Sequence, residues 1–290
     1  MISCSKNNVI LERKVEVSGP RKLYAVSKYP TPVLNTPYID SVYGGKDGRT
    51  LKKSKSGLVK ELEYVAYVGS SFEILDIINK GSHSVYKVFA PDYSIPELKI
   101  DLFIDSRFVD TTSTEPKKRI AKLPGKAEII RFMYDNIGAL YVWGGNNIEG
   151  VDQMFSFYPP KGELSAKETK EWGLKGLDCS GLLYQATDGY TPRNTHQLVH
   201  YGKAVEIEGL SVNQIIAKVE PLDLIVWKGH IIVILDSETT IQSAHSAWGV
   251  VKKDLESVLK QLISNRKAVN QWGDDKIKQF VIRRWYPQNN

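Results

Sequence analysis

The first third of the chain alternates short apolar runs with turn-forming residues. Many short strands without a helical period predict a small all-β barrel over residues 22–110, after an N-terminal extension of residues 1–21. The runs are Leu23 to Val26, Leu58 to Val68, Ser71 to Ile77, Ser84 to Phe89 and Ile100 to Ile104. The glycine-rich stretch from Tyr43 to Thr50 lacks the spacing of a phosphate-binding loop and is predicted to form a long hairpin loop.

The pattern changes after a polar segment. Residues 111–125 combine Thr, Ser, Pro and charged residues with little that could enter a core, which is typical of an interdomain linker. Beyond it, apolar side chains recur at the spacing of one helical face, which predicts a helix over residues 127–137. These side chains are Ile129, Ile130, Met133, Tyr134 and Ile137. A second domain is therefore predicted over residues 126–290.

This second domain mixes helical and strand patterns. One helix is expected to begin at Cys179 and another to run from Asp254 to Ile263. The runs of strand length are Lys203 to Ile207, Asp223 to Trp227, His230 to Leu235, Thr240 to Ser243 and Lys278 to Arg284. A helix that carries a cysteine, followed by an antiparallel sheet that carries a histidine, indicates an α+β fold.

Composition excludes several classes of protein. The 290 residues allow two domains, and 42% apolar with 25% charged residues is the range of a soluble globular protein. No apolar run reaches the length of a membrane-spanning helix, so no transmembrane segment is expected. The net charge is +6, but its basic residues are not interleaved with aromatic ones, so nucleic acid is not an expected partner.

The first residues leave the localisation open between the bacterial cytoplasm and the cell envelope. The segment from Met1 to Lys6 offers neither the basic start nor the apolar stretch of a signal peptide. Ile2, Ser3 and Cys4 resemble the end of a lipoprotein signal, which would make Cys4 a lipidation site. A chance cysteine in a frayed terminus is the alternative.

Cys179 is the candidate nucleophile. The only other cysteine is Cys4, so no disulfide framework is expected and Cys179 should be a free thiol. Unpaired N–H groups at a helix start favour the thiolate, so we expect a pKa lowered toward working pH. A buried, inert cysteine is the alternative for this residue taken alone.

His230 is the candidate base and Gln242 the candidate orienting residue. His230 opens an apolar strand after a turn, and Gln242 lies on the next strand after the turn from Asp236 to Thr239. The amide oxygen of Gln242 could accept from one ring nitrogen and leave the other for the thiol. His196 and His200 have the spacing of a zinc site, but Gln197 replaces the required glutamate, so neither a metal nor another cofactor is expected.

Four motifs, in this order, resemble the signature of the NlpC family. They are Tyr141-Val142-Trp143-Gly144-Gly145, Asp178-Cys179-Ser180-Gly181, Pro192-Arg193-Asn194-Thr195, and Pro221 to Trp227 with His230. The resemblance implies a papain-like cysteine peptidase that hydrolyses the γ-D-glutamyl to diaminopimelate bond of peptidoglycan stem peptides. It implies Cys179, His230 and Gln242 as catalytic residues, and an SH3-like type for the N-terminal barrel. It places around the substrate Tyr141, Trp143, Asp178, Ser180, Arg193 and Thr195. In relatives with such a barrel, the cleft is narrowed to stem peptides with a free N-terminal L-alanine.

Departures from the family pattern leave alternatives open. Leu222 stands where the family has glycine, and His245 rivals Gln242 as the third catalytic residue. Residues 146–176 form an insertion, expected to be a wall or lid near the cleft, whose Trp172 either packs it down or contacts substrate. An amidase or acyltransferase of the same superfamily, and an inactive wall-binding adaptor, are the alternative functions.

Overall fold

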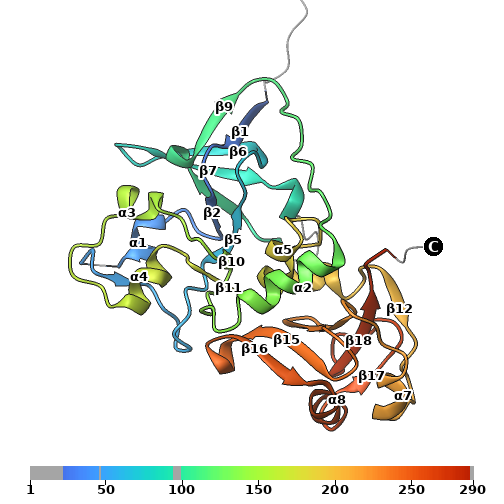
Figure 1. Cartoon of the computed structure of the whole chain (residues 1–290). Coiled ribbons are helices and arrows are strands. Elements are labelled where there is room, and N and C mark those ends of the chain that lie inside the picture. The colour runs from blue at the N-terminus through green and yellow to red at the C-terminus, as the bar shows by residue number, and fades with distance from the viewer. Residues whose placement is uncertain (1–21, 46, 94–98, 288–290) are drawn as a thin grey trace, which may run out of the picture.

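The computed structural model describes residues 22–45, 47–93 and 99–287. The N-terminal extension, including Cys4, lies outside these residues, so the lipidation hypothesis stays a prediction. Two antiparallel sheets dominate the described chain, one in each half, and helices α2 (Lys126–Asp135) and α5 (Cys179–Ala186) lie between them (Figure 1). None of the helices in the described ranges has the length and apolarity to cross a bilayer.

The first sheet contains seven strands in the order β5-β2-β8-β7-β6-β1-β9. Their bounds are β1 Leu23–Ser27, β2 Thr31–Leu34, β5 Leu62–Ala66, β6 Ser71–Asn79, β7 Ser84–Phe89, β8 Leu102–Asp105 and β9 Val109–Thr112. The five expected strands are present, while β2 and β9 were not expected from the pattern. The two-residue strands β3 (Tyr43–Gly44) and β4 (Thr50–Leu51) pair with each other and form the expected hairpin. We call residues 22–112, which contain this sheet, the first unit, and residues 126–287 the second unit. Assignment of the first unit to the SH3-like type stays a prediction.

Strand β9 extends two residues into the segment predicted as a linker. It pairs with β1, with Thr112 opposite Tyr24 and Thr111 opposite Ala25. The strand is polar and half exposed, which is tolerated at the edge of a sheet. Its composition therefore resembles that of a linker although its backbone is paired.

The second sheet has the order β12-β18-β13-β14-β15-β16, with the short β17 (Lys267–Ala268) parallel to β18. The remaining bounds are β12 Lys203–Val205, β13 Leu224–Trp227, β14 His230–Ile234, β15 Thr239–Ala244, β16 Gly249–Asp254 and β18 Gln279–Arg284. Alternate residues of β14 enter different cores: Ile231 and Val233 pack with α2 and α5, and Ile232 and Ile234 pack with α8 (Leu255–Ile263). The expected α+β fold, with a cysteine-bearing helix packed on an antiparallel sheet, is confirmed.

Leu222 adopts a backbone conformation that favours glycine. Its φ of 75° lies in the left-handed region, which costs a residue with a Cβ about 1–2 kcal/mol. The side chain is buried, its carbonyl accepts the indole N–H of Trp285 at 2.8 Å, and its N–H donates to Ile234 at 2.8 Å. The turn before β13 thus keeps a glycine-type conformation and uses the leucine side chain for packing.

The insertion packs onto the first unit. It contains β10 (Asn146–Asn147), α3 (Gln153–Phe157), α4 (Ala166–Trp172) and β11 (Gly176–Leu177), and α3 and α4 lie beside α1 (Ile39–Val42) (Figure 1). Trp172 is 1% exposed, donates its indole N–H to the Tyr158 carbonyl at 2.8 Å and contacts the Tyr43 ring. Of the two interpretations of Trp172, the structure therefore supports packing.

Candidate active site

Cys179 is the first residue of α5 because Asp178 caps the helix. The Asp178 carboxylate accepts the N–H of Gly181 at 2.7 Å, a side-chain cap that satisfies one free amide of the first turn. The helix lies directly on the preceding loop, since a Cβ at Gly181 would stand 1.9 Å from the Gly145 carbonyl oxygen. The Asp-Cys-Ser-Gly motif therefore encodes a capped helix start that fits closely against this loop and fixes the position of the sulfur.

The sulfur of Cys179 lies at the start of strand β14. The backbone N–H groups of Ile231 and Ser180 hydrogen-bond to it and lower its pKa. Ile231 directly follows His230, and α5 packs against both β14 and β15. The two residues expected to form the catalytic pair therefore come from adjoining elements.

The pKa of Cys179 is nevertheless raised, to about 12. Burial of the sulfur is the largest cause, and the Asp178 carboxylate adds to it, whereas Arg193 and the two backbone amides act in the opposite direction. The expectation of a lowered pKa was wrong because desolvation of a thiolate outweighs the partial positive charge of one helix end. Cys179 therefore rests as a thiol.

His230 is held by Gln242. The two side chains are joined by a hydrogen bond of 2.5 Å between Nε2 of His230 and Oε1 of Gln242. An amide oxygen can only accept, so Nε2 carries the proton and Nδ1 keeps a free lone pair. Burial lowers the pKa of His230 from its ordinary 6.5. The imidazole is therefore neutral at pH 7, in the tautomer whose Nδ1 can accept a proton.

His245 does not occupy the position of Gln242. It begins the turn after β15, and its ring packs on Tyr141 and Trp248 at centroid distances of 5.7 and 4.6 Å. Because Gln242 makes the hydrogen bond to His230, the geometry favours Gln242 over His245 as the orienting residue.

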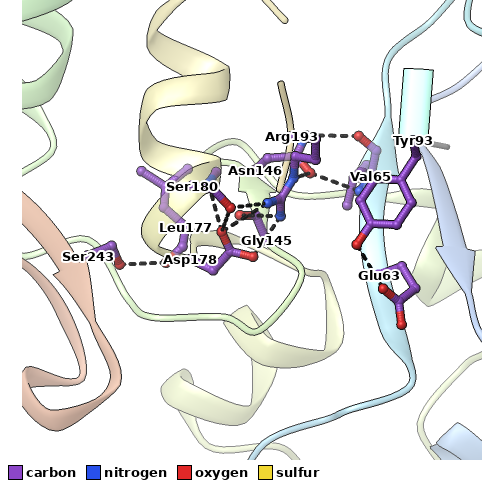
Figure 2. Close-up of polar contacts among 11 residues, drawn as sticks. Glu63, Val65, Tyr93, Gly145, Asn146, Leu177, Asp178, Ser180, Arg193 and Ser243 are labelled. Carbon is purple, nitrogen blue, oxygen red and sulfur yellow. Dashed lines mark hydrogen bonds and ion pairs between the residues drawn. The ribbon is translucent and has the colours of Figure 1, made fainter. Parts of the chain in front are cut away.

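Arg193 connects residues around the candidate nucleophile Cys179 (Figure 2). Its guanidinium donates to Asp178 at 2.7 Å, to Ser180 at 2.8 Å and to Asn146 at 3.2 Å, and it is 2% exposed. The resemblance places Asp178, Ser180 and Arg193 around the substrate, and all three line the cleft. Their polar atoms, however, hydrogen-bond to one another, which gives these residues a structural role at the cleft wall.

Asn146 extends this network to the first unit. Its side chain accepts from the N–H of Val65 at 2.9 Å and donates to the Val65 carbonyl at 2.8 Å, as a neighbouring strand would (Figure 2). Asn146 is fully buried and also bonds Arg193. The first unit is thereby tied to the residues that surround Cys179.

A cavity of about 260 Å³ lies in front of Cys179, between the two units. The predicted substrate residues Tyr141, Trp143 and Thr195 line it. The hydroxyl of Thr195 accepts the N–H of Gly229 at 2.8 Å and so holds the turn that precedes His230. Trp143 is half exposed, with the Lys60 ammonium 3.1 Å from its ring centroid.

The sequence did not predict that polar side chains of the first unit line the cleft. Glu63 and Tyr93 of the first unit line the same cavity, and the Tyr93 hydroxyl donates to Glu63 at 2.8 Å (Figure 2). Asn35 donates to the other carboxylate oxygen of Glu63 at 2.7 Å. The sequence pattern around Glu63 in β5 does not predict a binding role. Glu63 reaches the cleft only because the two units dock against each other.

Within residues 22–45, 47–93 and 99–287, no three His, Cys, Asp or Glu residues are grouped as metal ligands would be. The zinc-like pair is also divided, because α6 (Thr195–Leu198) contains His196 but ends before His200.

Among known proteins, only solved structures resemble this chain at a significant level. No family model and no curated protein matches the chain. An NlpC/P60 family protein from Bacillus cereus aligns with a TM-score of 0.35 and 14% identity, over 92% of this chain and 64% of its own. RipB, a peptidoglycan hydrolase from Mycobacterium tuberculosis, aligns with a TM-score of 0.32 and 20% identity, over 55% of this chain and 63% of RipB.

RipD from Mycobacterium tuberculosis, described as a non-catalytic NlpC/p60 domain protein adapted to peptidoglycan binding, gives a TM-score of 0.32 and 16% identity. Its alignment covers 55% of this chain and 95% of RipD. This chain spans less than two thirds of the Bacillus cereus protein and of RipB. Because these TM-scores lie below 0.5, we base the functional proposal on the motifs and the site geometry.

Proposed function

We propose that this protein is an NlpC-type cysteine endopeptidase that hydrolyses the γ-D-glutamyl to diaminopimelate bond of peptidoglycan stem peptides. The observation that carries the proposal is the site formed by α5, β14 and β15. Cys179 starts the helix, its sulfur accepts an amide N–H next to His230, and Gln242 fixes the imidazole tautomer. The four ordered sequence motifs support the family and the substrate.

In the proposed reaction, Nδ1 of His230 takes the thiol proton as the sulfur of Cys179 attacks the γ-carbonyl carbon. The resulting oxyanion is stabilised by the backbone N–H of Cys179 at the start of α5, because the N–H groups of Ser180 and Gly181 already bond the sulfur and the Asp178 carboxylate. The imidazolium then protonates the departing amine. Water, deprotonated by the same imidazole, releases the acyl group and regenerates the thiol.

The first unit supplies a group suited to a free amine at the other end of the cleft. Glu63 accepts two hydrogen bonds from neutral donors and forms no ion pair with the described residues. The Asp178 carboxylate, by contrast, is paired with Arg193 at 2.7 Å. We therefore propose that Glu63, with Tyr93 and Tyr141 nearby, receives the N-terminal ammonium of a short peptide.

The proposal predicts which peptides are cleaved. Incubation with L-Ala-γ-D-Glu-diaminopimelate should release L-Ala-γ-D-Glu, identified by mass spectrometry. N-acetylation of the alanine should lower kcat/KM by about ten- to a hundred-fold, because a charge-assisted hydrogen bond is lost. Equal cleavage of the acetylated peptide or of intact sacculi would contradict the free-amine requirement. Products of another mass would indicate an amidase or acyltransferase.

The pH dependence should show a single acid limb. The lowered pKa of His230 means that the imidazolium forms only below pH 6.5, where it cannot accept the thiol proton, so kcat/KM should fall with a midpoint below that value. Above it the raised pKa of Cys179 keeps the thiol intact, so kcat, measured at saturating peptide, should stay level through about pH 9. A preformed thiolate–imidazolium pair would instead give a bell-shaped profile with an alkaline fall.

One observation favours a second candidate, the wall-binding adaptor. A raised pKa for Cys179 is what an unreactive cysteine would show. An adaptor would bind stem peptides without turning them over at any pH. Binding without product formation by the unmodified protein would therefore select this alternative.

A further inference from the structure

A second cavity, of about 390 Å³, adjoins the catalytic residues. His230 and Gln242 line it from the sheet, and α8 with the segment that follows it closes another side. The cleft described above contains Cys179 but lies toward the first unit. The imidazole therefore stands at the border of a second, larger space formed entirely by the second unit.

This second cavity carries positive charge without a compensating acid. Lys253 and Arg266 line it, and none of its lining residues is an aspartate or glutamate. Neither cation forms an ion pair with a described residue, whereas many other basic side chains of the protein do. Two unpaired cations around one cavity favour an anionic ligand.

The two cations are close enough to affect the catalytic base. The Arg266 guanidinium carbon lies 4.4 Å from the centroid of the Trp227 ring, and that ring lies 5.2 Å from the ring of His230. Lys253 and Arg266 both contribute to the lowered pKa of His230. A ligand held by these cations would therefore lie near the imidazole of His230.

The remaining walls suit an aliphatic stem with a polar end. Ile232, Val258 and Leu262 supply apolar surface, while Gln261 and Asn265 supply neutral hydrogen-bonding groups. An extended side chain could lie along the apolar wall and place a terminal carboxylate between the two cations.

We propose that this second cavity is the subsite for the leaving group, and that Lys253 and Arg266 select a residue bearing a free carboxylate on the amine side of the scissile bond. The proposal rests on the proposed function, because it takes His230 as the residue that protonates the leaving amine. It adds a specificity determinant on the side of the cleavage site opposite to Glu63.

The test compares two tripeptides, L-Ala-γ-D-Glu-diaminopimelate and the same peptide with the carboxylates of its third residue converted to carboxamides. We expect the intact protein to cleave the carboxylate form with at least about ten-fold higher kcat/KM. In Arg266→Gln and Lys253→Gln the ratio of the two kcat/KM values should fall toward one. Lys252→Gln is the matched control, since it removes an equal charge from the adjacent position of β16, which lies outside the cavity lining.

A second measurement separates this proposal from the enzyme assignment. Calorimetric binding of both tripeptides to Cys179→Ala should show the same preference for the carboxylate form, and Cys179→Ala/Arg266→Gln should lose it. Cleavage of both peptides at equal rates, or a preference that survives both cavity variants, would overturn the subsite while leaving the peptidase assignment intact. A carboxylate preference in binding with no cleavage by the intact protein would support carboxylate binding in the second cavity, but would overturn both the peptidase assignment and the role of the cavity as a leaving-group subsite.

Discussion

Replacing Arg193 with methionine is expected to lower the free energy of unfolding by about 3–5 kcal/mol. The substitution leaves the Asp178 carboxylate, itself 8% exposed, without its ion-pair partner at 2.7 Å. It also removes the donors to Ser180 and Asn146. A buried charge that loses its counter-charge cannot recover its hydration, so most of the penalty comes from Asp178. Urea denaturation followed by tryptophan fluorescence measures the change.

Two further variants show whether this loss comes from the buried pair. Arg119→Met removes a pair with Asp188, whose carboxylate is half exposed, and should cost less than about 1 kcal/mol. Asp178→Asn/Arg193→Met removes both charges and should recover part of the stability lost in the single variant. If Arg193→Met lowers the free energy of unfolding no more than Arg119→Met does, the hydrogen bonds and ion pair of Arg193 contribute little to stability.

The sequence predicts the elements whose signal is local. Alternating apolar residues mark β1, β6 and β7 correctly, and the helix that begins at Cys179 follows from a motif with its own cap. Strand β2 was missed because it is short and contains Pro32. Its pairing with β8 is confined to Leu34 opposite Phe103. Such a strand is recognisable only from its partners.

The residues of the candidate site also divide into those with a local sequence signal and those placed only by long-range contacts. Cys179, His230 and Gln242 could be proposed because the helix and the strand hairpin that carry them are each continuous in sequence. Glu63 and Tyr93 could not, because they reach the cleft only through the docking of two units by contacts such as that of Asn146 with Val65. Long-range contact of this kind leaves no periodic pattern.

The pKa of Cys179 could not be predicted from the sequence, because its largest cause is the burial of the sulfur. The position at a helix start is local, and its favourable effect on the thiolate was correctly identified. Burial depends on everything packed around the sulfur, and the nearby Asp178 carboxylate adds to it. Because desolvation is a property of the whole fold, its larger effect became visible only in the structure.

Replacing Cys179 with alanine is expected to lower kcat for stem-peptide hydrolysis by at least about 10⁴-fold. No other cysteine lies within residues 22–45, 47–93 and 99–287, and the remaining groups can still bind the peptide but cannot form the acyl-enzyme. Affinity for the tripeptide should therefore persist while product formation is lost. Product release measured by liquid chromatography, with calorimetric binding on the same sample, distinguishes these effects.

Cys179→Ser is the conservative comparison for this prediction. Its hydroxyl takes the position of the thiol but is smaller and a far weaker nucleophile with a neutral imidazole as base, so the activity of this variant should also be low. Unchanged melting temperatures for both variants would show that the fold is intact, since the sulfur accepts only two backbone amides. Residual activity within ten-fold of the unmodified protein in Cys179→Ala would exclude the sulfur as nucleophile. The hydrolysis would then have to proceed by direct attack of water activated by His230, with no covalent intermediate.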